Sequence, residues 1–168
     1  MAGAYLADCS LTNDEASHFV NSLLILDFLR EGSITDIMRF GLDYYEHFPR
    51  VSIGHWPPFY YILQSLVLMI FGRSISTLLV FQAVAAGLAA AVAAVVARKR
   101  HGFWVGLATG GMVLCSPALT FQLNAVMIDI FLGLLVLLSA LAWARFARTG
   151  YCAWALAYAE LACCAILS

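Results

Sequence analysis

Residues 75–97 read ISTLLVFQAVAAGLAAAVAAVVA and contain no charged side chain. A helix needs about 20 mostly apolar residues to cross a bilayer, so this run predicts a transmembrane helix. Small residues at helical spacing predict close packing against a neighbouring helix; these are Gly87, Ala90, Ala91 and Ala94. A basic run, Arg98-Lys99-Arg100, follows directly and is expected to lie at the end of the span.

Other apolar runs lie on both sides of this segment. Residues 103–123 and 130–144 each predict a span, and Pro117 is expected to bend or end the first of them. Residues 151–168 begin a further apolar stretch, whereas residues 57–72 are apolar but short for a crossing. The pattern predicts an all-α integral membrane protein, with interfacial amphipathic helices followed by a transmembrane helix bundle.

The composition excludes several classes of protein. The chain has 168 residues, of which 63% are hydrophobic and 11% charged, whereas a soluble domain carries about 25% charged residues. A net charge of −1 offers no field that would attract a polyanion, so no nucleic-acid partner is expected. The five cysteines show no C-x-x-C spacing, which argues against a zinc or redox site.

The N-terminal third is polar by comparison, because eight of the ten acidic residues precede residue 57. Thr12 and Glu15 have capping-box spacing and predict a helix that ends near Gly32, too polar to span and suited to the membrane surface. Residues 33–56 mix aromatic, charged and turn residues and read as an interfacial loop. The predicted organisation is an outer-face loop with an interfacial helix over residues 1–56, a short interfacial or re-entrant helix over 57–72, and about four transmembrane helices over 73–168, the last of them truncated.

The basic residues predict the orientation. One cluster spans Arg98–Arg100 and another comprises Arg145 and Arg148. If both lie in the cytoplasm, residues 124–129 and everything before residue 75 lie outside. The alternative makes residues 57–72 a short span and puts both clusters outside, which the charge count disfavours.

Several polar residues are candidates for chemistry. Asp14 and Glu15 suit the N-terminus of a helix, where the helix dipole is positive. Asp129 lies at the end of a predicted span, and a carboxylate at such a position usually has a functional role. His47, Arg50 and His55 have side chains that could hold a phosphate. Asp14 and His18 are four residues apart on one helix face and could hold a metal ion, but two ligands do not define a metal site.

The order of these motifs resembles one family. The motifs are Asp14-Glu15, Tyr44-Tyr45-Glu46-His47, His55-Trp56-Pro57-Pro58, Phe71-Gly72 and Asp129. The chain is similar here to the N-terminal part of GT-C-fold glycosyltransferases that use polyprenyl-phosphate-linked sugars, such as protein O-mannosyltransferases and the aminoarabinose transferase of lipid A.

The resemblance implies roles for individual residues. Asp14 is expected to be the catalytic base, with Asp129 as the second acid and Glu15 as a further member of the catalytic set. His55, Arg50, His47 and Tyr45 are expected to bind the donor phosphate and sugar. The resemblance leaves both a metal-free and a divalent-metal-dependent reaction open.

The predicted function is transfer of a sugar from a polyprenyl-phosphate-linked donor to an acceptor on the outer face. The expected location is a bacterial plasma membrane, with membrane lipid and a lipid, glycan or protein acceptor as partners. Family members are longer, so the chain is expected to be a fragment that is inactive alone. The alternative is a small non-enzymatic membrane protein, such as an assembly partner or transporter subunit.

Overall fold

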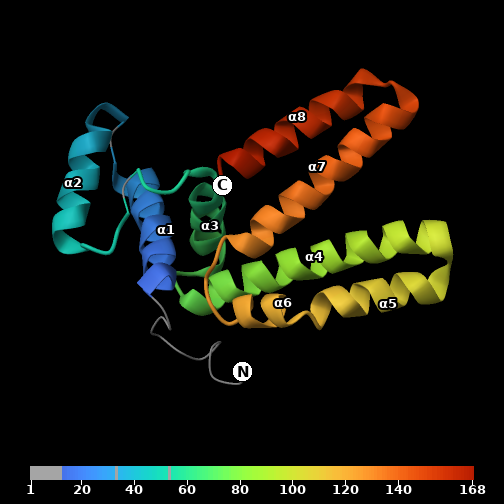
Figure 1. Cartoon of the computed structure of the whole chain (residues 1–168). Helices are drawn as coiled ribbons and strands as arrows, with labels where there is room; N and C mark the ends of the chain where they lie inside the picture. The colour runs from blue at the N-terminus through green and yellow to red at the C-terminus, as the bar shows by residue number, and fades with distance from the viewer. Residues whose placement is uncertain (1–12, 33, 53) are drawn as a thin grey trace. The chain divides into compact units, whose positions relative to one another are not determined.

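The computed structural model of the chain describes residues 13–32, 34–52 and 54–168 (Figure 1). All regular secondary structure in these ranges is helical, which confirms the predicted fold class. The elements in chain order are α1 (Asn13–Glu31), η2 (Ile34–Asp36), α2 (Ile37–His47), α3 (Phe59–Phe71), α4 (Ile75–His101), α5 (Phe103–Leu114), α6 (Pro117–Gln122), α7 (Asp129–Thr149) and α8 (Cys152–Ile166). Thr12, the expected cap of α1, lies outside the described residues.

The chain forms two compact units, and the first is discontinuous in sequence. It contains the residues up to Phe81 together with Asn124–Met127, whereas the second contains Gln82–Leu123 and Ile128–Ser168. The first unit therefore includes α1, η2, α2, α3 and the start of α4, and it recruits a short segment from much later in the chain.

The core of the first unit forms where α1 packs against α3. Its apolar cluster consists of buried residues from α1, α3, the start of α4 and the later segment: Leu26, Leu68, Ile75, Leu78, Leu79 and Val126. Phe19 and Leu23 of α1 pack against this cluster. The apolar spacing that predicts α1 thus supplies part of the core, and α1 ends at Glu31, as expected.

The prediction of a loop over residues 33–56 is wrong in part, because η2 and α2 occupy Ile34–His47. The helix α2 carries aromatic side chains at Phe40 and Tyr44, one turn apart. Phe40 packs edge-on against Phe28 of α1 with 5.4 Å between ring centroids, and Tyr44 stacks on Phe40 at 6.1 Å. The mixed composition concealed this i, i+4 aromatic spacing, which lets the helix pack on α1.

The second unit contains two helical hairpins (Figure 1). Gly102, with φ of 92°, joins α4 to α5, and Gly150, with φ of 69°, joins α7 to α8. A Cβ atom added to Gly106 would lie 2.7 Å from the carbonyl oxygen of Ala94, so the two backbones approach closely there. Ala94 belongs to the small-residue stripe of α4, and its predicted packing role is confirmed.

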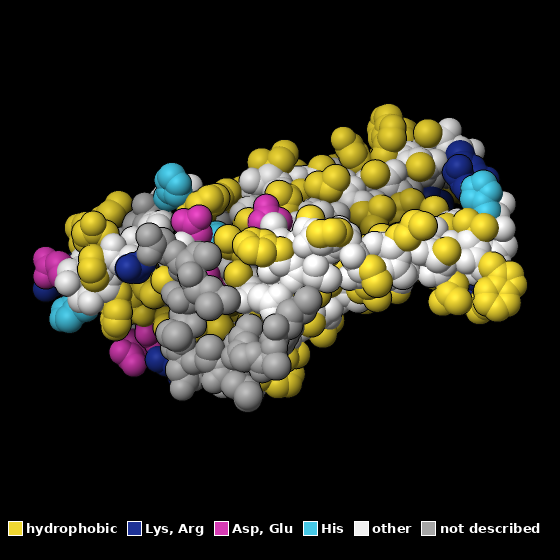
Figure 2. Space-filling view, turned by 60° about the horizontal axis from the view of Figure 1, so that its bottom comes forward, with side chains coloured by type: hydrophobic (Ala, Val, Ile, Leu, Met, Phe, Trp, Pro, Cys, Tyr) yellow, Lys and Arg dark blue, Asp and Glu magenta, His cyan; other side chains and the backbone are white. Residues whose placement is uncertain are grey.

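Two helices, α4 and α7, are long and apolar enough to cross a membrane, and they match the predicted spans at 75–97 and 130–144. The shorter apolar helices are α3, α5 and α8. Residues 103–123 do not form one helix, because α5 ends at Leu114 and Pro117 begins α6. Proline has no N–H to donate and therefore suits the first turn of a new helix. Figure 2 shows hydrophobic side chains over much of the visible helical surface, which suits contact with lipid.

Candidate functional site

Asp14 and Glu15 are adjacent in the first turn of α1 but have opposite environments. Asp14 is exposed, whereas Glu15 is buried with 2% of its surface accessible. A buried carboxylate is costly unless it is hydrogen-bonded. The Oε1 atom of Glu15 accepts the backbone N–H of Val126 at 3.1 Å, which meets part of that requirement.

A second hydrogen bond holds the same late segment. The hydroxyl of Tyr60, on α3, donates to the carbonyl oxygen of Met127 at 2.8 Å. Val126 and Met127 are therefore fixed to α1 and α3 through side chains rather than through a continuous secondary structure. The buried carboxylate of Glu15 therefore helps to hold this segment, whereas Asp14 is exposed.

His18 lies one turn after Asp14 and is the centre of a buried aromatic cluster. Its Nδ1 atom is 2.7 Å from the hydroxyl of Tyr61, and its ring centroid is 5.3 Å from that of Trp56 and 6.4 Å from that of Tyr60. Only 3% of His18 is accessible. The ring thus joins α1, α3 and the segment that carries the Trp56-Pro57-Pro58 motif.

Polar contacts continue along α1, and the sequence analysis missed them. The hydroxyl of Ser22 donates to Oε1 of Gln64 at 2.5 Å, and Oδ1 of Asn21 accepts the backbone N–H of Ser52 at 2.9 Å. Glu15, His18 and Ser22 follow one another at helical spacing, so a polar stripe was visible in the sequence. Polar residues of membrane proteins commonly face the protein interior, and that expectation would have identified it.

His55 is connected to the start of α1 through Trp56. The two rings meet edge-on with 4.9 Å between centroids, and Trp56 in turn contacts His18. His55 and Arg50 are both exposed. The structure thus brings the His55 segment to the end of α1 that carries Asp14.

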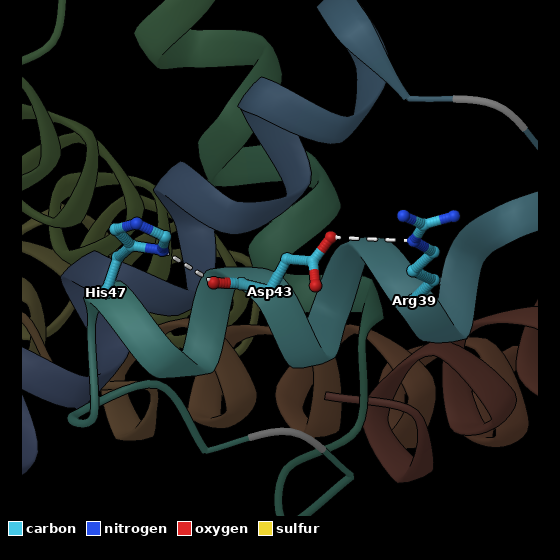
Figure 3. Close-up of polar contacts among 3 residues, drawn as sticks. All are labelled: Arg39, Asp43 and His47. Atoms are coloured by element: carbon cyan, nitrogen blue, oxygen red, sulfur yellow. Dashed lines mark hydrogen bonds and ion pairs between the residues drawn. The ribbon is translucent and has the colours of Figure 1, made fainter.

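Tyr45 and His47 lie on α2 and are exposed. Figure 3 shows His47 in line with Asp43 and Arg39 along the same helix. The Nδ1 atom of His47 is 2.8 Å from the carbonyl oxygen of Asp43, so Nδ1 donates and Nε2 points elsewhere. Arg39 and Asp43 form an exposed pair at 3.9 Å. These contacts are local to α2 and do not connect Tyr45 or His47 to Asp14.

A cavity of about 270 Å³ lies between α1, α2 and the segment after α2. Its wall is largely apolar and includes four aromatic residues, Phe28, Phe40, Trp56 and Tyr61, with Asn21 and Ser52 as polar members. An apolar cavity with few polar groups is typical of a ligand site.

Asp129 is the first residue of α7, is exposed, and belongs to the second unit. It lines a groove of about 350 Å³ together with Ser116 and Gln122. Ser116 directly precedes α6, and Gln122 is the last residue of that helix. The Oε1 atom of Gln122 is buried and has no hydrogen-bond partner among the described residues. The predicted pairing of Asp129 with Asp14 on one face stays a prediction.

Charged groups also join α1 to the link between α3 and α4. Arg73 contacts Asp27 at 2.6 Å, and the hydroxyl of Tyr44 donates to the same carboxylate at 3.3 Å. Burial, with the nearby negative charge of Asp27, raises the pKa of Tyr44 to about 12, although Arg73 acts in the opposite direction. This cluster stabilises the unit and is not a candidate for catalysis.

Within the described ranges, no three His, Cys, Asp or Glu side chains are grouped so that they could share a metal ion. Asp14 and His18 do not form the pair considered from their spacing, because Asp14 is exposed and His18 is engaged with Tyr61. A metal would need ligands beyond these side chains.

The fold and the site define an all-α membrane protein with an exposed acid on a polar, hydrogen-bonded N-terminal helix. The sequence profile of the dolichyl-phosphate-mannose-protein mannosyltransferase family matches residues 55–168. The chain belongs to this family, and it is therefore placed with glycosyltransferases of the GT-C type. No curated protein and no solved structure showed significant similarity to it. The matched residues begin at His55, so the family assignment is independent of Asp14 and Glu15.

Proposed function

We propose that the protein transfers a sugar from a polyprenyl-phosphate-linked donor to a hydroxyl or amine acceptor on the outer face of a bacterial plasma membrane, which it crosses several times. Membership of a mannosyltransferase family supports the transfer reaction. The proposal for the site is carried by the different exposure of two adjacent acids. Asp14 is exposed, whereas Glu15 is buried.

In the proposed reaction, Asp14 is the general base. Its carboxylate accepts the proton of the acceptor, the freed electron pair of that oxygen or nitrogen attacks the anomeric carbon, and the bond from that carbon to the phosphate oxygen breaks. The polyprenyl phosphate leaves with the electron pair of that bond. A positioned base of this kind contributes about 10²–10⁴-fold to the rate.

His55 and Arg50 are proposed to stabilise the negative charge on the departing phosphate, with His47 and Tyr45 as outer contacts to the donor. The contact from His55 through Trp56 to His18 supports the assignment of His55. The cavity between α1, α2 and this segment suits an isoprenoid chain, because its wall is largely apolar. Asp129 is proposed as the second acid of the site.

The proposal is tested with Asp14→Asn in membranes that contain the protein expressed from its own gene. Transfer of radiolabelled mannose from polyprenyl-phosphate-mannose to membrane acceptors should fall by about 10²-fold or more, since the base is lost. Glu31→Gln is the matched control, because Glu31 is an exposed acid at the other end of the same helix. It should leave transfer unchanged.

Retained transfer in a well-expressed Asp14→Asn variant would remove Asp14 from the reaction. Absence of transfer by the wild type, with a second protein purifying in stoichiometric amount, would instead favour the assembly-partner alternative. Addition of EDTA to the same assay tests for a divalent metal, because loss of transfer that Mg²⁺ or Mn²⁺ restores would establish one.

A further inference from the structure

A groove lies between α4 and α7, and none of its lining residues has a role in the proposed transfer reaction. Its volume is about 790 Å³, and all of its lining residues belong to the second unit. On α4 the lining follows one helical stripe from Leu88 to Arg100, and on α7 it follows a stripe from Leu141 to Arg148. Within the described residues these are the two helices long and apolar enough to span a membrane, so we expect the groove to open within the bilayer.

The groove is apolar along its length and basic at one end. Lys99 and Arg100 from α4 and Arg145 and Arg148 from α7 line that end. All four side chains are exposed, and neither ion pair found in the described part of the chain involves them. The only acids in residues 82–168 are Asp129, at the opposite end of α7, and Glu160, within α8. The cations at the end of the groove therefore have no carboxylate partner among the described residues.

Aromatic residues indicate the depth of this end in the membrane. Trp104 and Tyr151 lie just beyond the two hairpin turns and are 77% and 69% exposed. The guanidinium of Arg145 lies over the ring of Trp154 at 5.0 Å. Figure 2 shows a group of Lys and Arg side chains gathered beside a histidine. Tryptophan and tyrosine concentrate at the level of lipid headgroups, so the four cations lie at that level.

The length of the groove matches one leaflet. From Leu88 to Arg100 the α4 stripe rises about 18 Å at 1.5 Å per residue, and half of a hydrocarbon core is about 15 Å. Basic pockets between transmembrane helices on the cytoplasmic side bind anionic headgroups. We propose that this groove binds one anionic phospholipid of the cytoplasmic leaflet, with its phosphate held by Lys99, Arg100, Arg145 and Arg148 and its acyl chains along α4 and α7.

This lipid site is distinct from the proposed donor site. Asp129, the proposed second acid, is the first residue of α7, whereas the cations lie near the last residue of that helix. The two ends of this 21-residue helix are about 30 Å apart. The proposal does not depend on the transfer reaction, so its failure would leave that reaction untouched.

The test uses the full chain purified in detergent with an equimolar mixture of phosphatidylglycerol and phosphatidylcholine, and counts bound lipid by native mass spectrometry. We expect phosphatidylglycerol to be retained in preference. Arg100→Gln and Arg148→Gln should each weaken its apparent affinity about fivefold, the factor expected for one basic residue at an anionic surface. Arg98→Gln should have no effect, because Arg98 lies over Phe103 of α5 and does not line the groove.

A second pair of variants distinguishes lipid binding in the groove from attraction of lipid to a basic surface. Ala91→Trp fills the groove while keeping every charge, and it should also reduce lipid retention by fivefold or more. Ala108→Trp is the matched control, because Ala108 is exposed on α5 and lies outside the groove. Equal retention by Arg98→Gln and Arg100→Gln, or no effect of Ala91→Trp, would overturn the proposal. A lipid-free dimer that Ala91→Trp disrupts would overturn it as well, because the groove would then be an interface between copies.

Discussion

At the scale of single residues, buried polar side chains join α1 to α3. Gln64 and Ser22 are fully buried between α3 and α1. The Oε1 atom of Gln64 accepts from Ser22, but its Nε2 atom has no partner among the described residues. Removing one member of such a pair costs more than removing both, because an unpaired buried group keeps its desolvation penalty.

We therefore predict non-additive effects for this pair. Ser22→Ala should reduce the free energy of unfolding by about 1–3 kcal/mol, since it leaves Gln64 without its remaining bond. The double variant Ser22→Ala/Gln64→Leu should recover most of that loss. Thermal unfolding of the wild type, Ser22→Ala, Gln64→Leu and the double variant in one detergent measures the coupling, and strictly additive losses would contradict it.

Tyr44 should make the stability depend on pH in the alkaline range. Its pKa rises from 10.0 to about 12 in the folded protein, so folding favours the neutral phenol. The stability that it contributes is present in full below pH 10 and is lost as pH rises from 10 to 12. Tyr44→Phe should therefore show a smaller fall in Tm over this range than the wild type.

Tyr45→Phe is the control for this prediction, because Tyr45 is the exposed neighbour on the same helix. It should follow the wild-type curve from pH 9 to pH 12. Parallel curves for Tyr44→Phe and the wild type would show that the phenol of Tyr44 does not carry the effect.

At the scale of elements, the hairpin of α4 and α5 depends on close contact between small residues. A Cβ atom at Gly106 would lie 2.6 Å from the Cβ of Arg98 and 2.7 Å from the carbonyl oxygen of Ala94. Contacts this short force the two helices apart. Gly111, on the same helix, has nothing within 4 Å of the position of a Cβ atom.

These two glycines give a matched pair of substitutions. Gly106→Ala should destabilise the protein by about 1–3 kcal/mol, the usual cost of overpacking. Gly111→Ala should be neutral or stabilise by up to about 1 kcal/mol, because alanine is the better helix former. Unfolding temperatures in detergent distinguish them, and equal shifts for both variants would contradict the close approach.

The sequence was sufficient for the elements whose signal is long and uniform. The apolar runs predicted α4 and α7, and Pro117 predicted the interruption before α6. The helix α2 was missed because charged and polar residues separate its few apolar ones and much of its surface is exposed. Ile37, Phe40 and Tyr44 do follow one another at helical spacing, so the stripe was present in the sequence and was overlooked.

The same contrast applies to the candidate site. Asp14 and Glu15 were recognisable as a pair, but their different environments depend on Val126, which lies 111 residues beyond Glu15. The position of His55 next to the start of α1 likewise depends on rings in three segments. Long-range pairing of this kind has no local periodicity, and a single sequence therefore does not reveal it.

At the scale of the whole molecule, the prediction concerns orientation. With 21 residues, α7 rises about 31 Å, close to the thickness of a hydrocarbon core. In a variant without the native cysteines, Asp129→Cys should react with an impermeant maleimide on intact cells. Arg100→Cys should react only after permeabilisation, because basic ends remain in the cytoplasm. Labelling of both positions from one side would refute this orientation.

The recruitment of Asn124–Met127 into the first unit has a consequence for biogenesis. The ribosome delivers α1 and α3 well before it delivers Val126, and at about 5–20 residues per second the interval lasts seconds. During that time Glu15 has no hydrogen bond from the backbone N–H of Val126, because Val126 has not yet been synthesised. The N-terminal unit is therefore completed only after α4, α5 and α6 have been synthesised, so a defect in membrane insertion of this hairpin should appear first as misfolding at the start of the chain.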